Sequence, residues 1–345
     1  MALIRSRGSI HGNRAVAGWL FVTPMILVIG VFLFIPVIMA AWVSVSDWTG
    51  IGPPFAEGVN FVGMKNYAEL LGGSGLATRD LGTAMRNNFY YVLLVVPLQT
   101  AVALWLALLV NRRIMRSRGF FRTTFYFPSV TSSVAITVLW LFLFSATGPV
   151  NRVLAWLSIE GPNWFFDPRG ILHILLGALG ITATDNPLTA VTFLGISGWE
   201  WVSGPSVAMS AYILMAVFTT TGTFMLLFIA GLQQINQEVE EAAMTDGANG
   251  WQRFWYVTLP MLKPTVFTVV TLGLIGTWQV FEQIYTGTKG GPAKTTLTPA
   301  YLSFDSAFLD HDWPTGAAIA FILFAIIVVL TIIQRLWLGR TEVGR

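Results

Sequence analysis

Residues 201–237 read WVSGPSVAMSAYILMAVFTTTGTFMLLFIAGLQQINQ, a stretch of 37 residues without a charged side chain. An α-helix of ~20 apolar residues, rising ~1.5 Å per residue, crosses the hydrocarbon core of a bilayer. This stretch is therefore long enough to span a membrane. Only 11% of the chain is charged, whereas soluble domains carry about 25%, so the composition excludes an ordinary soluble enzyme.

Five more charge-free runs lie on either side of this stretch. They hold 32, 25, 29, 18 and 22 residues and cover 15–46, 87–111, 123–151, 264–281 and 313–334. The run of 18 crosses a membrane only if Lys263 and Glu282 lie at the interfaces. The sequence therefore predicts an all-α integral membrane protein with six transmembrane helices. The predicted spans cover about 17–45, 88–110, 123–145, 206–232, 264–285 and 314–337.

The distribution of lysine and arginine predicts the orientation, because cytoplasmic loops carry the excess of these residues. With the N-terminus inside, the inner segments hold 13 of the 20 basic residues and 5 of the 17 acidic ones. We therefore expect both termini to be cytoplasmic. Residues 1–16 are then a cytoplasmic N-terminus, 17–338 a single transmembrane domain and 339–345 a cytoplasmic tail.

The first 45 residues also have the basic start of a cleaved signal peptide. The apolar core of such a peptide is ~7–15 residues long. The first charge-free run is 32 residues long and is interrupted by Pro24 and Pro36. The sequence therefore favours an uncleaved first span.

Two shorter charge-free runs follow the third span. They hold 15 and 14 residues, at 170–184 and 186–199, and are too short to cross a membrane comfortably. They predict extra short helices, interfacial or re-entrant, in the outer loop between spans three and four. Because the two runs come as a pair, the topology of the other spans is the same even if both cross.

The chain lacks the residue patterns of metal and nucleophile chemistry. It has no cysteine, which excludes disulfides, thiolate zinc sites, iron–sulfur clusters and a cysteine nucleophile. Its three histidines, His11, His173 and His311, are far apart in the sequence and form no HExxH pair. We expect no catalytic residue and no metal site.

The longer inner loop, 233–263, reads QQINQEVEEAAMTDGANGWQRFWYVTLPMLK. A helix is expected from Glu238 to Thr245, a turn at Asp246-Gly247, and a second helix from Trp251 to Leu259 that ends at Pro260. The alanines and the glycine of this loop offer a smooth surface on which another protein could pack. From these residues alone, a docking site and a plain connector between spans are equal alternatives.

The residues Glu241-Ala242-Ala243, Gly247 and Val257-x-Leu259-Pro260 resemble the EAA loop of bacterial ABC importer permeases, in which Ile stands at the position of Val257. The lead-in AGLQQI at 230–235 is similar to the carbohydrate-importer branch, which has Pro in place of Asn236. Other segments that resemble this branch are FVGMKNYAELL at 61–71, RTTFYFPSVTSSVAITVLW at 122–140 and TGTKGGPAKTT at 286–296. The resemblance covers most of the chain apart from about 168–205.

The resemblance implies that the inner loop docks on a cytosolic ATPase, whose ATP-driven closure switches the permease between inward- and outward-facing states. The implied coupling residues are Glu241, Ala242, Ala243, Asp246, Gly247, Leu259 and Pro260. The chain has no GxxxxGK[ST] phosphate-binding loop. ATP and Mg would therefore be bound by the partner ATPase and no cofactor by this chain, which is expected to be the permease subunit of an importer for a sugar or related solute.

The same resemblance implies the other partners. They are a second homologous permease subunit, forming a heterodimer with this chain, an ATPase subunit dimer and an extracytoplasmic solute-binding protein. The implied location is the bacterial inner membrane, which the chain crosses several times. Membrane lipid is a further partner, and the five arginines of 112–122 suit anionic lipid. So short a basic stretch does not predict nucleic-acid binding.

The resemblance places a solute site on three spans. The matching residues are Ser129, Ser133, Phe218, Thr219, Thr220, Thr277, Trp278 and Gln279. Hydrogen-bonding groups and flat apolar surfaces at mid-membrane suit a sugar or polyol, although membrane Ser and Thr usually bond their own helix or a neighbouring one. Glu282, at the outer end of span five, is either functional or a solvated interfacial acid.

The outer segment 146–205 is longer than the resemblance leads one to expect. Its excess, about 168–205, contains Trp199-Glu200-Trp201 and the two short apolar runs. We hypothesise that this excess contacts the solute-binding protein; a lid or a packing elaboration are the alternatives. The other tryptophans at predicted outer ends fit an aromatic belt.

Two other classes of protein are alternatives to the importer. An integral-membrane transferase would need a His/Asp/Glu cluster at one interface, and the inner face offers acids in only one loop. A secondary transporter would show inverted repeats and charge pairs within the membrane, and the sequence shows neither. The span interiors contain no Lys or Arg, which favours a neutral sugar over a phosphate ester, unless the partner permease holds the site.

Overall fold

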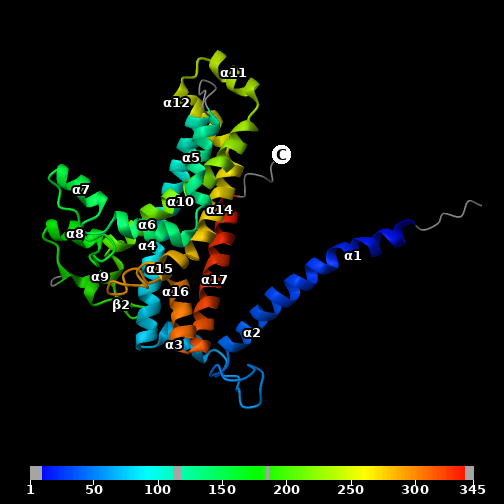
Figure 1. The fold of residues 1–345 in the computed structure, drawn as a ribbon, viewed down its shortest axis with the longest axis vertical. Coiled ribbons are helices and arrows are strands. Elements are labelled where there is room, and N and C mark those ends of the chain that lie inside the picture. The colour runs from blue at the N-terminus through cyan, green and yellow to red at the C-terminus, as the bar shows by residue number, and fades with distance from the viewer. Residues whose placement is uncertain (1–9, 112–117, 184–185, 339–345) are drawn as a thin grey trace, which may run out of the picture.

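The computed structural model describes residues 10–111, 118–183 and 186–338. The predicted cytoplasmic N-terminus up to residue 9, the basic residues 112–117 and the predicted tail 339–345 lie outside these described residues. Helices make up nearly all of the regular structure that is described, and α5 and α14 pack on the paired helices α4 and α10 (Figure 1).

Five helical segments are long and apolar enough to cross a membrane. They are the continuous helix of α1 (Ile10–Ile29), the π-helical η1 (Gly30–Phe34) and α2 (Ile35–Ser44); α4 (Leu76–Val110); α10 (Val207–Gln233); α14 (Lys263–Trp278) with α15 (Glu282–Thr286); and α17 (Trp313–Leu338). α4 begins well before the predicted second span. Its first turns carry the charges of Arg79, Asp80 and Arg86, which face protein segments and so do not interrupt the helix.

The third span is broken, which corrects the expectation of one helix over 123–145. α5 (Arg118–Val130) and α6 (Ser133–Leu143) meet at an angle of 96°, and only the pair taken together gives a sixth span. Pro128 removes one helical N–H group from the end of α5. Ser132 then leaves the helical region, with φ −53° and ψ 129°, at the start of α6. Serine and threonine favour such helix ends.

The extra short helices predicted in the outer loop are present. They are α7 (Pro149–Trp156), α8 (Ile171–Ala178), the 3₁₀-helix η3 (Pro187–Thr189) and α9 (Gly198–Trp201). A small antiparallel hairpin, β1 (Thr192–Phe193) and β2 (Ile196–Ser197), pairs Thr192 with Ser197 and Phe193 with Ile196. The second apolar run therefore folds partly as a hairpin.

Two clusters of buried side chains follow the contact between α4 and α10, and a third, smaller one lies between α14 and α17. One of the first two clusters includes Tyr91, Met209 and Tyr212, and the other includes Ala107 and Phe228, nearer the C-terminal ends of the two helices. α5 packs on α10 at Gly222, where a Cβ atom would lie 2.3 Å from the carbonyl oxygen of Phe125. Glycine is therefore required at this crossing.

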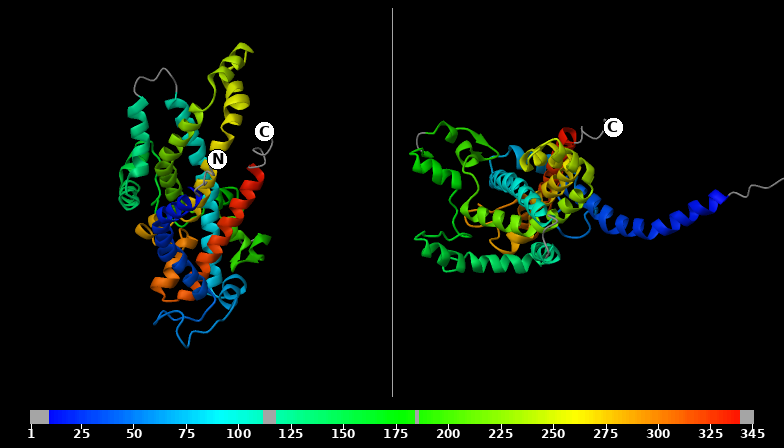
Figure 2. Two further views of the ribbon diagram at one scale, coloured as in Figure 1. Left: turned by 90° about the vertical axis from the view of Figure 1, so that its right-hand side faces the viewer. Right: turned by 90° about the horizontal axis from the view of Figure 1, so that it is seen from above.

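The first span extends away from the rest of the molecule (Figures 1 and 2). Only 6% of its most apolar window is buried, and Phe21 is 87% exposed. Its last part, α2, packs on α17. Most of the first span is thus free to contact lipid or another subunit.

The inner loop and several short outer elements lie toward opposite ends of the molecule (Figure 1). The outer elements are α3 (Lys65–Gly72), α16 (Pro299–Phe304) and the π-helical η5 (Asp305–Leu309). The inner loop contains α11 (Gln237–Thr245), α12 (Gly250–Arg253), the π-helical η4 (Phe254–Thr258) and α13 (Leu259–Met261).

Candidate functional site

The inner loop forms a protruding helical hairpin whose first helix is capped at both ends. The Asn236 side chain accepts a hydrogen bond from the Glu238 amide at 3.0 Å and so fixes the start of α11. At the other end Gly247 has φ +79°, its amide donates to the Met244 carbonyl, and Ala248 N donates to Ala243 O at 3.0 Å. This pattern is a Schellman motif, which favours glycine. The predicted turn at Asp246-Gly247 is therefore present.

The second half of the loop differs from the prediction at Pro260. An Asn249–Gln252 capping box starts α12, and the chain then continues through η4 and α13 into α14. The sequence predicted that the helix ends at Pro260, but Pro260 lies within α13, and α14 begins at Lys263. The wider π-turn of η4 directly precedes this proline, and Leu259 N donates five residues back to Phe254 O. Such a turn relieves the clash that proline makes with an α-helical carbonyl.

Most of the coupling residues implied by the resemblance are open to a partner. Glu241, Ala242, Asp246, Gly247 and Pro260 are exposed. Ala243 and Leu259 are half-buried. Large side chains, Trp251 at 71% exposure and Tyr256 at 80%, stand on the second half of the hairpin. A small-residue helix beside exposed aromatic rings can form an interface with another protein.

Two adjoining polar cavities lie beside α10. The first, of about 280 Å³, is formed by α5, α6, α10 and α15. The second, of about 420 Å³, is formed by α4, α10, α14 and α15. Both are lined by Thr219, Thr220, Phe224 and Gln283. The shared residues make the two cavities parts of one region.

Six of the eight predicted solute residues line these cavities. They are Ser129, Ser133, Thr219, Thr220, Thr277 and Gln279. The structure does not bring the other two to either cavity: Phe218 is 51% exposed and lies beside Trp140, and Trp278 is buried against Leu323 and Ile327 of α17. Glu282 lines the second cavity and is exposed.

The hydroxyl groups of Ser129, Thr219, Thr220 and Thr277 donate their hydrogens within the protein. Ser129 Oγ donates to Thr219 O at 2.6 Å and accepts from Thr223 N at 3.2 Å. Thr219 and Thr277 donate to carbonyls of their own helices. Each of these hydroxyls can therefore accept a hydrogen bond from a solute, but donors must come mainly from amides.

Of the three cavity glutamines, Gln279 was predicted from the sequence, but Gln99 and Gln283 were missed. Gln283 Nε2 donates to Ser133 Oγ at 3.0 Å, between the two cavities. Gln99 lines the second cavity from the middle of α4. The signal that could have found Gln99 is its place at the centre of the charge-free run 87–111, where a buried amide needs a partner.

The outer insert, which we define as residues 170–206, is closed by its own ends. Gly170 and Ser206 form an antiparallel bridge, and Ile171 N donates to Pro205 O at 2.9 Å. Gly170 also packs tightly on Ser203: a Cβ atom on Gly170 would lie 2.3 Å from the carbonyl oxygen of Ser203. The insert therefore leaves and rejoins the main body at one place.

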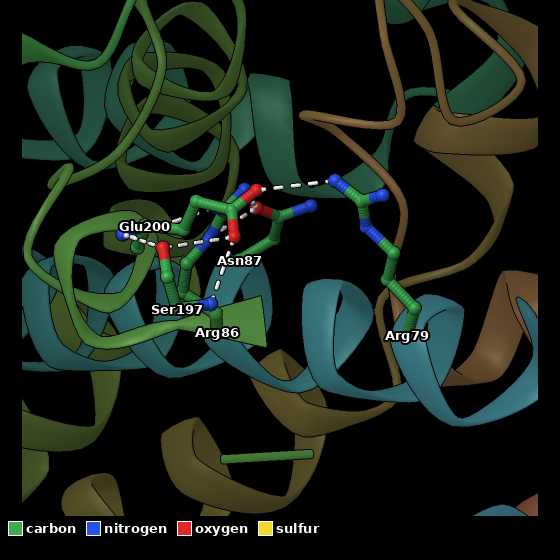
Figure 3. Close-up of polar contacts among 5 residues, drawn as sticks. All are labelled: Arg79, Arg86, Asn87, Ser197 and Glu200. Atoms are coloured by element: carbon green, nitrogen blue, oxygen red, sulfur yellow. Dashed lines mark hydrogen bonds and ion pairs between the residues drawn. The ribbon is translucent and has the colours of Figure 1, made fainter. Parts of the chain in front are cut away.

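α4 holds the insert through a polar cluster around Glu200 (Figure 3). The Glu200 carboxylate completes a capping box with Ser197 and lies 3.4 Å from Arg79 Nη2. Arg86, which is buried, donates to the Glu200 carbonyl at 3.3 Å. Partial burial raises the pKa of the Glu200 carboxyl, but hydrogen bonds from Ser197 and the charge of Arg79 outweigh this effect and leave the pKa below its ordinary value.

The same part of α4 also holds the loop between α15 and α16. Asn87 Nδ2 donates to the carbonyls of Lys294 and Leu297 at 2.8 and 3.0 Å. Lys294 forms an ion pair with Asp80 at 2.7 Å. The insert and this loop are therefore both fixed to the N-terminal part of α4.

Apolar spanning helices around polar cavities, with a protruding hairpin at one end, define a membrane transport subunit. The chain belongs to the family described as binding-protein-dependent transport system inner membrane component, which matches residues 99–342. It is an ABC importer permease, a multi-pass protein of the bacterial inner membrane.

Relatives and solved structures agree with this assignment. The chain is 29% identical over 334 residues to the lactose transport system permease protein LacF of Rhizobium radiobacter, covering 95% of this chain and 96% of LacF. It shares its fold, at a TM-score of 0.71 and 18% identity, with a bacterial ABC transporter involved in the import of the acidic polysaccharide alginate, over 96% of this chain and 98% of that one. A bacterial alginate transporter in complex with an alginate pentasaccharide-bound periplasmic protein matches at a TM-score of 0.67 and 18% identity, over 96% of both chains.

Proposed function

We propose that this permease conducts a neutral sugar or oligosaccharide through the two cavities beside α10. The observation that carries the proposal is their lining of hydroxyl and amide groups next to aromatic side chains, without Lys or Arg. Sugars are bound by such groups, whereas an acidic or phosphorylated solute calls for basic side chains. LacF, named for lactose, supports a neutral cargo.

ATP hydrolysis by a partner ATPase drives the transport in this proposal. The docking surface is the capped helix α11 with Glu241, Ala242, Ala243, Asp246 and Gly247, extended by Leu259 and Pro260. ATP and Mg are bound by the ATPase, because the chain carries no phosphate-binding loop of its own. The hairpin is then cytoplasmic, together with both termini.

Two further partners follow from the exposed surfaces. The free length of the first span suits a second, homologous permease subunit, since a heterodimer can place the cavities between two such bodies. The outer insert, fixed to α4 beside the 287–297 loop, suits the solute-binding protein. The alginate transporter in complex with its periplasmic protein supports an assembly of this type.

Uptake into proteoliposomes tests the proposed cargo. The complex of both permeases, the ATPase and the binding protein is supplied with radiolabelled lactose, maltose, trehalose and glycerol 3-phosphate in turn. We expect ATP-dependent accumulation of at least one neutral sugar and none of glycerol 3-phosphate. Accumulation of the phosphate ester alone would contradict a neutral cargo.

A further inference from the structure

Gln99 lies at the centre of α4 and is fully buried, with 0% exposure. It is 12 residues from each end of the charge-free run 87–111, so it lies near the middle of the bilayer. A polar side chain at this depth is costly unless its hydrogen bonds are made. Gln99 lines the larger cavity, opposite α14.

The hydrogen bonds of Gln99 are incomplete. Thr220 Oγ1 lies 2.6 Å from Gln99 Oε1 and 2.7 Å from Ala216 O, and it has one hydrogen to give. Gln99 Nε2 is buried and has no partner among the described residues. Exchanging the amide nitrogen and oxygen would pair Nε2 with Thr220 but leave Oε1 alone. Either orientation leaves one atom of the amide without a partner.

The backbone of α14 lies directly beside this amide, at a glycine. A Cβ atom on Gly273 would lie 2.4 Å from Gln99 Nε2, so glycine makes room for the amide. One turn further along α14, a Cβ on Gly276 would meet nothing within 4 Å, because Gly276 faces the cavity. Gly273 lies against the amide nitrogen at the wall of the cavity, and a shift of α14 relative to α4 would widen the access of a solute to it.

We propose that Gln99 recognises the solute by binding one of its hydroxyl groups during transport. This inference rests on the proposed function, since it assigns a residue to the same pathway. A hydroxyl both donates and accepts, so it satisfies the free amide atom in either orientation. The second span thereby joins the three spans on which the solute residues were predicted. Leucine would fill the same space without an unpartnered atom, so stability alone does not account for glutamine here.

The experiment compares Gln99→Leu with Gln334→Leu in the reconstituted complex. Gln334 on α17 is a matched control, because it is also buried with one amide oxygen unpartnered but lines neither cavity. The probes are the sugar that the wild-type complex accumulates most and its single-deoxy analogues. The same binding protein is used with every variant. A change in the ratio of the uptake rates of sugar and analogue is therefore caused by the permease.

We expect Gln99→Leu to lower kcat/KM for the sugar about tenfold, as for one lost buried hydrogen bond. One deoxy analogue, discriminated by the wild type, should then be transported as well as the sugar itself. The unfolding temperature of the complex should stay the same or rise. Gln334→Leu should leave the ratio between sugar and analogues unchanged.

Unchanged discrimination in Gln99→Leu, or a loss of uptake that merely follows a lower unfolding temperature, would overturn the role of Gln99 while leaving the proposed cargo intact. A wild-type complex that accumulates no neutral sugar would overturn the proposed cargo, and the role of Gln99 with it.

Discussion

At the scale of single residues, Gly222 sets how closely α5 lies on α10. A methyl group there would meet Phe125 O at 2.3 Å, Tyr126 Cα at 2.8 Å and Ser129 Oγ at 2.8 Å. We therefore expect Gly222→Ala to destabilise the protein by ~1–3 kcal/mol, as overpacking does, and to displace Ser129 from the first cavity. Thermal unfolding of the purified complex measures the first effect and sugar uptake the second.

The control for this change is Gly18→Ala, on the exposed first span, where a Cβ would meet nothing within 4 Å. An unfolding temperature for Gly222→Ala equal to that of this control would show that α5 and α10 are not packed as described.

Six of the eight solute residues predicted from the sequence line the cavities, but the sequence did not reveal their partners. Thr277, Trp278 and Gln279 are consecutive, and a linear motif cannot tell that Trp278 faces α17 while its neighbours line the cavity. Consecutive helical positions differ by ~100°. Gln99 was missed because its significance comes from Thr220 and Gly273, which are distant in the sequence.

At the scale of elements, the outer insert is held by contacts that depend on the charge of Glu200. Its pKa is lower in the folded protein than its ordinary value of 4.5. The stabilisation is therefore present above that value and is lost as the pH falls through the lowered folded pKa. We expect Glu200→Gln at pH 7 to increase hydrogen exchange of the insert about two- to fivefold, the equivalent of ~0.5–1 kcal/mol for a partly exposed pair.

Acid should loosen the insert of the wild type and have little further effect on the variant. Glu160→Gln, at an exposed carboxylate in the same outer segment, is the matched control. Equal rates of hydrogen exchange in the insert of all three proteins at pH 7 would show that the contacts between Glu200 and α4 do not hold the insert.

The membrane-spanning elements were largely predictable, because bilayer thickness fixes how many apolar residues a span needs. The bend of the third span was not, since apolar composition carries no information on direction and the 96° turn arises at Ser132. The early start of α4 was hidden by Arg86, whose charge is accommodated by the insert. The continuation of the helix through Pro260 depends on a π-turn that no local pattern indicated.

At the scale of the whole molecule, the hairpin of the inner loop connects α10 and α14, two helices that line the second cavity. Three residues, 234–236, separate the end of α10 from α11, and Leu262 alone separates α13 from α14. Thr220 on α10 and Thr277 on α14 face the same cavity. In the proposed mechanism, a displacement of the hairpin by the ATPase would reach the cavity walls through α10 and α14, which join the hairpin through these short connections.

The most direct test of this account is ATP hydrolysis by the purified complex with and without sugar-loaded binding protein. The comparison is between wild type, Glu241→Ala and Gly247→Asp on the hairpin, with Ala190→Asp on the outer insert as a variant remote from the ATPase. We predict that the loaded binding protein stimulates the wild type, and that both hairpin variants either stay at the basal rate or lose the ATPase on purification. Ala190→Asp should still purify with the ATPase. Full stimulation of both hairpin variants would contradict the claim that this hairpin couples ATP hydrolysis to transport.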